Sequence, residues 1–274
     1  MLLKRFIEFN KNKQNLFILF NGDSILYDNP TKSFLFNPES LYLDSRYKDY
    51  RIGIAVKDDV YIYAIQLKEI GIKNISNSEI DQIDLRFMLP QLNSNEFQLV
   101  SRAKQLLHWY TSNRYCSYCG SINIFEEKEE ALVCNCNSVF KYPTISPCII
   151  TLVTNDTKIL LARNKLFPQG MFSALAGFIE TGESAEEALI REVKEEVNLD
   201  IENIRYYSSQ SWPFPSQLML GYFCECKDGS PEPDGEEIEE AAWFDIKDLP
   251  NTPPDTSIAG KLIKSYIEDH SQPL

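Results

Sequence analysis

Short apolar runs separated by polar turns follow one another from the N-terminus to position 95. Apolar and β-branched residues gather at 15–20, 52–56 and 61–66, and turn-forming sequences interrupt them at 21–23 and 57–59. Runs of this length, bounded by Asn, Gly and Asp, are typical of strands. The N-terminal part is therefore predicted to be rich in β-structure, and it contains no catalytic motif.

The period of the pattern then changes to that of a helix. Apolar side chains recur at helical spacing over 97–111, which predicts a helix that leads into a cluster of cysteines. Beyond Pro147, the runs 148–153 and 158–163 flank a polar four-residue turn and predict a β-hairpin.

Strands and helices mix in the C-terminal part. We expect a helix over 184–198, strands over 218–226 and 241–244, and a last helix over 257–268. The acidic, Pro- and Gly-containing segment 227–240 is expected to be a loop. This order of elements predicts an α/β or α+β sandwich.

Composition and charge narrow the class of protein. A chain of 274 residues that is 43% hydrophobic can bury more than one core, so two or more domains are expected. The net charge of −13 opposes bulk attraction to nucleic acid or to an anionic membrane. The apolar run 16–20 is too short for a signal peptide, and no segment is long enough to span a bilayer. We expect a soluble, cytoplasmic protein without a membrane partner.

An acidic helix carries the strongest chemical signal. Ser184 followed by Glu187 forms a capping box, so a helix should begin there. Glu192, Glu195 and Glu196 then lie on one helical face, and such a like-charge cluster destabilises an isolated helix. Mg²⁺ or Mn²⁺ with oxygen ligands would supply the missing positive charge. The alternative is an exposed helix in which Glu187 and Glu195 pair with Arg191.

The segment 177–199 resembles the signature of the Nudix hydrolases, Gly-x5-Glu-x7-Arg-Glu-U-x-Glu-Glu-x-Gly-U, in which U is bulky and aliphatic. The matching positions are Gly177, Glu183, Arg191, Glu192, Val193, Glu195, Glu196 and Leu199. Asn198 stands in place of the last Gly, and Asn tolerates the left-handed conformation that ends many helices.

The resemblance implies a Nudix αβα sandwich and assigns roles to its residues. Glu192 and Glu196 would be the principal metal ligands, and Glu195 would be a further ligand or the base that deprotonates the attacking water. Arg191 would orient Glu183 and the helix. Bound divalent ions would screen the diphosphate and acidify a water molecule.

A segment rich in aromatic residues and proline follows at 209–219. Two prolines flank Phe214, so a stiff loop that presents Trp212 and Phe214 is expected, and flat aromatic rings suit stacking on a base. The alternative is a hydrophobic loop packed on the core. The segment resembles the Ser-Gln-Pro-Trp-Pro-Phe-Pro-x-Ser signature of the NADH diphosphatase branch of the Nudix family. Ser211 replaces the first Pro, and Gln217 stands at the final Ser position with Ser216 beside it.

This branch implies further contacts for the metal and the substrate. Glu237 matches a downstream metal ligand, and Ala176 would ligate through its carbonyl. The residues that would contact the substrate are Glu129, Tyr142, Phe178, Gln210, Ser211, Trp212, Pro213, Phe214, Pro215, Ser216, Gln217 and Ala259. Phe178 and Tyr142 could instead be core aromatics, and Glu129 could simply belong to the charged run 126–130.

Four of the seven cysteines form a candidate zinc site. Cys116 and Cys119 have the spacing of a zinc knuckle, and an odd number of cysteines favours metal ligation in a reducing compartment over disulfides. The second half, Cys134 and Cys136, has one intervening residue instead of two, and Asn137 occupies the position of the usual fourth Cys. Either Cys136 reaches the ion by a local shift or the site is degenerate. We favour one structural zinc per chain held by four thiolates.

The remaining cysteines, Cys148, Cys224 and Cys226, fall in predicted strands and are expected to be buried. The predicted domains are an N-terminal β-rich domain at 1–111, a zinc ribbon at 112–145 and a Nudix domain at 146–274.

The expected function is metal-dependent hydrolysis of NADH and NAD⁺ to the nicotinamide mononucleotide and AMP. The family resemblance implies a homodimer in which the ribbon helps to build the site. Removal of NAD caps from RNA and hydrolysis of another diphosphate such as ADP-ribose are the alternative enzyme functions. A catalytically dead Nudix module that senses nucleotides is the non-enzymatic alternative, which the intact Glu192, Glu195 and Glu196 oppose.

Overall fold

The chain folds into two compact units. A computed structural model describes residues 12–37, 51–67, 79–126, 128–136 and 139–270. One unit comprises 1–144 together with 213–216, and the other comprises 145–212 and 217–274. The three-domain division expected from the sequence stays a prediction. Within the described ranges, no helix has the length and apolar character needed to cross a bilayer.

A five-stranded sheet forms the N-terminal unit, with strand order β3-β4-β1-β2-β5. The strands are β1 (Gln14–Asn21), β2 (Ser24–Asp28), β3 (Arg51–Lys57), β4 (Val60–Gln66) and β5 (Ile80–Asp84). Strand β1 pairs with β4 in parallel, and the other pairs are antiparallel. The three predicted strands are confirmed. Strands β2 and β5 were not predicted, and β5 offers no apolar run because its sequence mixes Ile with polar residues.

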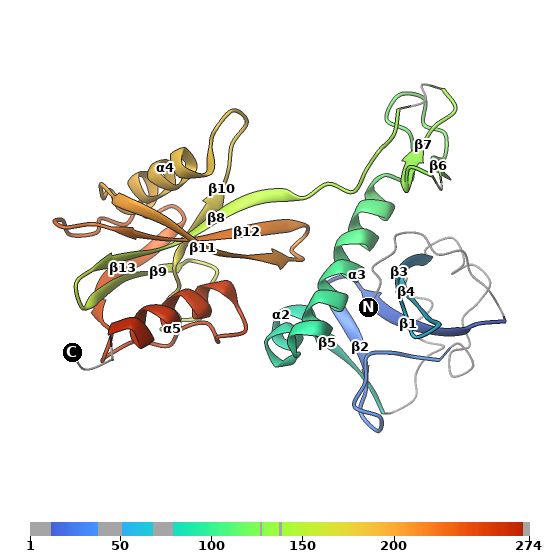
Figure 1. Ribbon diagram of the computed structural model, residues 1–274, viewed down its shortest axis with the longest axis horizontal. Coiled ribbons are helices and arrows are strands. Elements are labelled where there is room, and N and C mark those ends of the chain that lie inside the picture. The colour runs from blue at the N-terminus through green and yellow to red at the C-terminus, as the bar shows by residue number, and fades with distance from the viewer. Residues whose placement is uncertain (1–11, 38–50, 68–78, 127, 137–138, 271–274) are drawn as a thin grey trace. The chain divides into compact units, whose positions relative to one another are not determined.

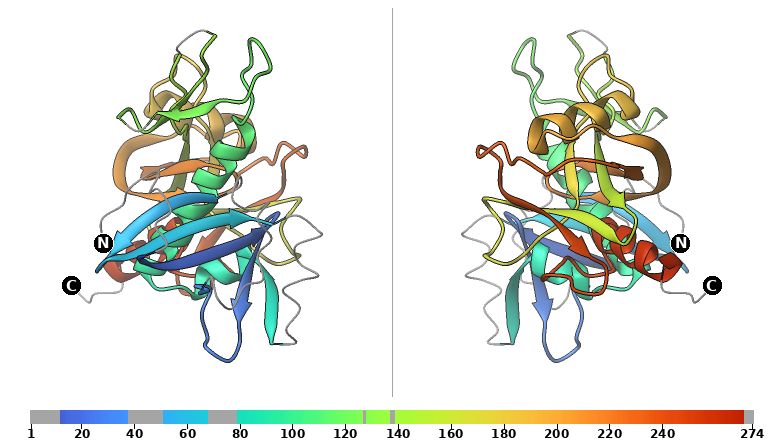
Figure 2. Two further views of the ribbon diagram at one scale, coloured as in Figure 1. Left: turned by 90° about the vertical axis from the view of Figure 1, so that its right-hand side faces the viewer. Right: turned by 90° about the vertical axis from the view of Figure 1, so that its left-hand side faces the viewer.

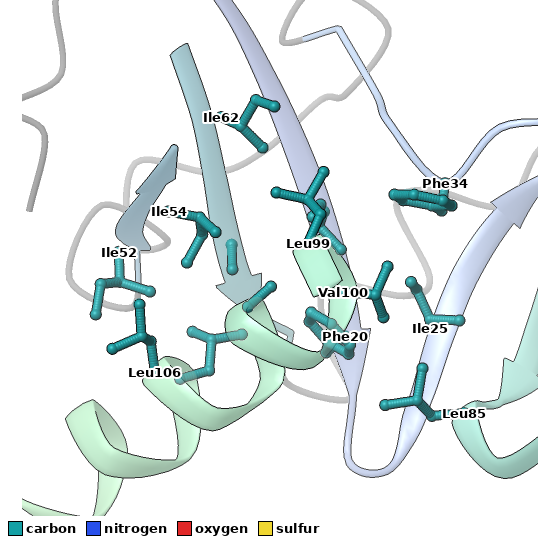
Figure 3. Packing of buried hydrophobic residues seen from close by; sticks show 14 of the residues in the cluster. Phe20, Ile25, Phe34, Ile52, Ile54, Ile62, Leu85, Leu99, Val100 and Leu106 are labelled. Carbon is teal, nitrogen blue, oxygen red and sulfur yellow. The ribbon is translucent and has the colours of Figure 1, made fainter. Parts of the chain in front are cut away.

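A long helix covers one face of this sheet. Helix α3 (Ser94–Ser112) begins three residues before the predicted position, because Asn93 and Glu96 form a capping box. Its apolar side packs with Phe20, Ile25 and Ile52 of the sheet (Figure 3). Two short turns of helix precede it, α2 (Leu85–Met88) and the 3₁₀ helix η3 (Leu89–Gln91). A small antiparallel hairpin follows it, β6 (Ile124–Glu126) with β7 (Ala131–Val133).

The C-terminal unit contains a six-stranded mixed sheet. Its main path runs β11-β12-β8-β9-β13, and β10 pairs with residues 148–151 of β8, whereas β9 pairs with β8 at 154–155. The strands are β8 (Ser146–Asn155), β9 (Lys158–Asn164), β10 (Leu175–Phe178), β11 (Glu202–Trp212), β12 (Gln217–Glu225) and β13 (Ile238–Asp245). Strands β12 and β8 run parallel, which places residues 71 positions apart in the sequence side by side.

Two helices sandwich this sheet. Helix α4 (Ala185–Val197) and helix α5 (Ile258–His270) lie on opposite faces (Figures 1 and 2). Alternation along β8 explains the two layers, since Ile149 and Val153 pack toward α4 whereas Ile150 and Leu152 pack toward α5. The predicted αβα sandwich beside a β-rich N-terminal part is confirmed.

Two expectations about loops are wrong in part. Strand β13 begins at Ile238, inside the segment 227–240 that was expected to be a loop, because its backbone pairs with β9. Most of 209–219 is also strand, because β11 and β12 pair up to Trp212 and Gln217 and leave only 213–216 as a turn. In both places the backbone pairing with another strand outweighs the local turn-forming sequence.

Candidate active site

Helix α4 places its carboxylates by means of well-defined ends. The Ser184 hydroxyl accepts the Glu187 N–H, and Glu187 in turn accepts the Ser184 N–H, so the predicted capping box is confirmed. Asn198 ends the helix in the left-handed conformation, with φ of 54°. The stripe of Ala188, Leu189, Val193 and Val197 is fully buried against the sheet. Glu192, Glu195 and Glu196 lie beside this stripe.

A single guanidinium organises the acidic residues. Arg191 donates from Nε and Nη2 to Glu183 at 2.6 and 2.9 Å, and from Nη1 to Glu192 at 2.9 Å and Glu195 at 3.0 Å. Its remaining donor binds the Phe178 carbonyl oxygen at 2.9 Å. The hydrogen bond from Arg191 lowers the pKa of Glu183 to about 2. Glu195 thus pairs with Arg191, as the alternative of a salt-bridged helix expected, but Glu187 serves as a cap instead.

Glu196 is the most deeply buried carboxylate of this group. The residue is 6% exposed, and within the described part of the chain its Oε2 atom has no hydrogen-bond partner. Burial, followed by the charges of Glu192, Glu237, Asp234 and Glu195, raises the pKa of Glu196 to about 8. A buried acceptor surrounded by negative charge fits a cation.

Gly177 provides the space for the Glu192 carboxylate. A Cβ atom at position 177 would lie 2.0 Å from Cδ of Glu192, closer than any real contact allows. Glycine at this position therefore leaves the space in which the Glu192 carboxylate lies against strand β10. Burial, only partly offset by Arg191, raises the pKa of Glu192.

Glu237 reaches this group from the start of β13. Its charge raises the pKa values of both Glu192 and Glu196, so it lies in their neighbourhood. Among the described residues, the carboxylates do not form a group of three with oxygens within 4.8 Å of one another. Repulsion between like charges and the hold of Arg191 on Glu192 account for this spacing. Mg²⁺ or Mn²⁺ fits this group of residues. The Oε2 atom of Glu196 lacks a protein partner among the described residues, Gly177 leaves space for the Glu192 carboxylate, and these cations prefer oxygen ligands.

The four candidate zinc ligands converge in the N-terminal unit. The Sγ atoms of Cys116, Cys119, Cys134 and Cys136 all lie within 4.8 Å of one another. Cys136 reaches the group in spite of its short spacing and lies 3.5 Å from Cys116 Sγ. Hydrogen bonds from Ser121, followed by those from the other thiols, lower the pKa of Cys119 to about 6, which favours the thiolate form that binds metal. Asn137 lies outside the described residues.

The other three cysteines are buried at 3% exposure or less, as expected. Burial, followed for Cys148 by the charge of Glu192, raises the pKa of Cys148 to about 11 and that of Cys224 to about 12. These two thiols therefore stay protonated at neutral pH and act as small apolar side chains.

The predicted substrate residues divide between the two units. Phe178, Gln210, Ser211, Trp212, Gln217 and Ala259 belong to the C-terminal unit, whereas Glu129, Tyr142, Pro213, Phe214, Pro215 and Ser216 belong to the N-terminal unit. Phe178 is 52% exposed, in keeping with a contact surface, whereas Ala259 is buried. Trp212 is partly buried and packs against the hydrophobic core to which α5 contributes.

Several of these side chains already have protein partners. Gln210 binds the start of α5, donating to the Thr256 carbonyl oxygen at 2.8 Å and accepting the Ile258 N–H at 2.7 Å. The Tyr142 hydroxyl donates to Glu129 at 2.5 Å. The Arg86 guanidinium lies 4.4 Å from the ring centre of Phe214. Substrate contact by all twelve residues stays a prediction.

Asp234 is a residue that no sequence pattern marked. It accepts backbone N–H groups from residues 236–238, next to Glu237. The available signal was an Asp followed by Gly235 at a turn, which is common in loops of no function. The loop that contains Asp234 contacts the end of helix α4, and hydrophobic periodicity cannot predict such a contact between distant segments.

Comparison with known proteins links both parts of the chain to one family. A family model described as "NUDIX domain" matches residues 144–266, and one described as "NADH pyrophosphatase-like rudimentary NUDIX domain" matches residues 14–109. The second match covers the region in which the sequence showed no motif.

Relatives named "NAD-capped RNA hydrolase NudC" match over much of the chain. The protein from Pseudomonas syringae pv. syringae is 46% identical over 175 residues, which are 64% of this chain and 63% of that protein. The protein from Vibrio atlanticus is 37% identical over 80% of this chain and 81% of its own length. A solved NUDIX hydrolase from Nitrosomonas europaea is 27% identical, with a TM-score of 0.47 over 58% of this chain and 94% of that one.

We predict that Gly177→Ala weakens Mn²⁺ binding about 10- to 100-fold, because the added Cβ displaces the Glu192 carboxylate. Isothermal titration of chelator-treated protein with Mn²⁺ measures the effect, and thermal unfolding checks that the variant is folded. Glu186→Gln removes an exposed charge from the same helix and should bind as wild type does. An unchanged Mn²⁺ affinity in Gly177→Ala would contradict the inference that Gly177 makes space for the Glu192 carboxylate.

The raised pKa of Glu196 predicts how stability depends on pH in chelator-treated protein. The folded state holds this proton up to about pH 8, whereas an ordinary Glu loses it near 4.5. The free energy of unfolding should therefore fall as the pH rises from about 4.5 to about 8. Urea unfolding across this range measures the slope, which Glu196→Gln should reduce and Glu186→Gln should keep. An identical slope in Glu196→Gln would contradict the assignment.

The convergence of four thiols predicts that Cys136→Ser lowers the zinc content of the purified protein, whereas Cys226→Ala leaves it unchanged. Elemental analysis of protein purified without added zinc provides the measurement. Equal zinc in Cys136→Ser and wild type would exclude Cys136 from the ligands.

Proposed function

The chain belongs to the Nudix hydrolase family, and we propose that it hydrolyses the diphosphate bond of NADH and NAD⁺ to release AMP and the nicotinamide mononucleotide. The observation that carries the reaction type is the buried carboxylate of Glu196 on the Nudix helix, whose Oε2 atom has no hydrogen-bond partner among the residues that the structure describes. The match of 14–109 to an NADH pyrophosphatase-like model supports the substrate.

The proposed metal site consists of oxygen donors of the C-terminal unit. Glu192, Glu196 and Glu237, with the Ala176 carbonyl, would hold Mg²⁺ or Mn²⁺, and Glu195 would be a further ligand or the general base. When bound, these cations would screen the diphosphate charge and lower the pKa of a water molecule.

The chain's own residues prepare this site for the reaction. Arg191 holds Glu192 and Glu195 at fixed positions through one guanidinium nitrogen, which limits the movement of both carboxylates. If Glu195 acts as base, its 61% exposed side chain can take a proton from the attacking water and release it to solvent. Glu196 contributes a full negative charge only after its proton leaves, so cation binding and deprotonation are coupled.

The end of the hairpin formed by β11 and β12, at residues 209–219, would bind the organic part of the substrate. Trp212 and Phe214 offer flat rings for stacking on nicotinamide or adenine. The proposed contacts are Glu129, Tyr142, Phe178, Gln210, Ser211, Trp212, Pro213, Phe214, Pro215, Ser216, Gln217 and Ala259. Because the side chain of Gln210 is occupied by α5, its contribution would be to hold the strand beside Trp212.

The four-cysteine cluster is proposed to hold one structural Zn²⁺ per chain, because four protein ligands leave no position for substrate or water. We further propose a homodimer, on the resemblance to the NADH diphosphatase branch. The cytoplasm is the proposed location, since all seven cysteines are unpaired and a thiolate site requires a reducing compartment.

Removal of NAD caps from RNA is a second candidate function, favoured by the names of the relatives from Pseudomonas syringae and Vibrio atlanticus. The bond is the same as in the free dinucleotide, so one metal site would serve both substrates. The net charge of −13 gives no general attraction to RNA, so a capped end would have to be recognised at the cap.

Incubation with NADH and Mg²⁺ or Mn²⁺ should release AMP and the reduced mononucleotide, identified by mass spectrometry. Glu196→Gln should lower kcat by more than about 100-fold, since loss even of a group that supports a ligand costs about 10- to 100-fold. Glu186→Gln is the matched control. Rapid cleavage of ADP-ribose with NADH left intact would refute the proposed substrate. A higher kcat/KM for NAD-capped RNA than for NADH would favour the second function.

A further inference from the structure

The loop before β13 is built around the carboxylate of Asp234. Oδ1 of Asp234 accepts the N–H groups of Glu236 and Glu237 at 3.2 Å and that of Ile238 at 2.9 Å. Oδ2 also accepts the Glu237 N–H at 3.2 Å. One side chain thereby fixes the main chain of three successive residues, with Glu237 in the middle.

The same loop is hydrogen-bonded to the C-terminal end of helix α4. The Asp234 N–H donates to the Glu196 carbonyl oxygen at 3.1 Å, and the Glu232 N–H donates to the Val197 carbonyl oxygen at 2.9 Å. The last carbonyl groups of a helix have no partner within the helix, so these bonds satisfy groups that need one. The Asn198 side chain adds a bond to Glu232 at 2.9 Å.

Among the described residues, Glu237 forms its hydrogen bonds through its main chain. Its N–H is bound by Asp234, and its carbonyl oxygen accepts the Lys165 N–H at 3.1 Å at the end of β9. Its side chain is exposed, and its charge acts on Glu192 and Glu196. The main chain therefore sets where this carboxylate can reach.

We propose that Asp234 is a positioning residue, which holds Glu237 in the divalent metal site by joining the turn before β13 to the end of helix α4. Asp234 acts through hydrogen bonds and is not itself a metal ligand. This inference rests on the proposed role of Glu237 as a ligand. Groups that support a ligand in this way typically contribute about 10- to 100-fold to metal affinity.

A charge effect would be the competing explanation, because the Asp234 charge also raises the pKa of Glu196. Two variants of Asp234 separate the explanations. Asp234→Asn and Asp234→Ala remove the same charge, but only Asn keeps an oxygen that can accept the three N–H groups. Glu236→Gln removes a charge beside Glu237 without removing an acceptor of these bonds.

The experiment is isothermal titration of chelator-treated full-length protein with Mn²⁺ alone. Asp234→Ala should weaken binding about 10- to 100-fold. Asp234→Asn should be closer to wild type than to Asp234→Ala, and Glu236→Gln should resemble wild type. Amide exchange at residues 236–238 should become faster in Asp234→Ala and remain slow in Asp234→Asn.

A double-mutant cycle tests whether Asp234 acts through Glu237. Adding Asp234→Ala to Glu237→Gln should cost little further Mn²⁺ affinity, because the residue being positioned is already disabled. If Asp234→Ala does not fold, Asp234→Ser replaces it in the cycle, with an affinity between those of wild type and Glu237→Gln.

Equal weakening by Asp234→Asn and Asp234→Ala, or full additivity in the cycle, would overturn the inference while the proposed function stands. Wild-type affinity in Glu237→Gln would remove Glu237 from the ligands and this inference with it. Retained NADH hydrolysis in that variant would then leave the proposed reaction intact.

Discussion

The burial of negative charge on helix α4 is the constraint around which the C-terminal unit is arranged. Glu196 is buried in the charge field of Glu192, and the Arg191 guanidinium of the same helix binds Glu183, Glu192 and Glu195 instead. Such an arrangement is unfavourable for the apoprotein and can persist only because the apolar stripe of α4 anchors the helix to the sheet. The energy of the core is thus used to hold carboxylates in positions that a cation stabilises.

The features that could be predicted from the sequence are those set by neighbours along the chain. Helix α4 was predicted within one residue at each end, because Ser184, Glu187 and Asn198 act through local hydrogen bonds and backbone conformation. The same periodicity places three carboxylates beside one another. Strand β11 was missed, since a polar strand with one partner shows no clear alternation, and β10 is too short to detect.

The rest of the site depends on contacts between distant segments. Glu237 could be named only from a resemblance, and its attachment to α4 through Asp234 has no periodic signal. Convergence of Cys136 with Cys116 likewise follows from the local path of the chain and not from the standard spacing. Sequence reasoning therefore identified the chemistry of the site better than its supporting structure.

Two positions of the Nudix signature that are glycine in the pattern differ in what they permit. At 177 the requirement is for empty space, because the Glu192 carboxylate fills the volume of any side chain. At 198 the requirement is for a left-handed backbone, which Asn meets while its amide also bonds to Glu232. During divergence the second position can therefore drift among residues that accept this conformation and gain new contacts, whereas any side chain at the first displaces the Glu192 carboxylate. A sequence signature that gives both glycine positions the same weight would assign too low a match score to chains such as this one.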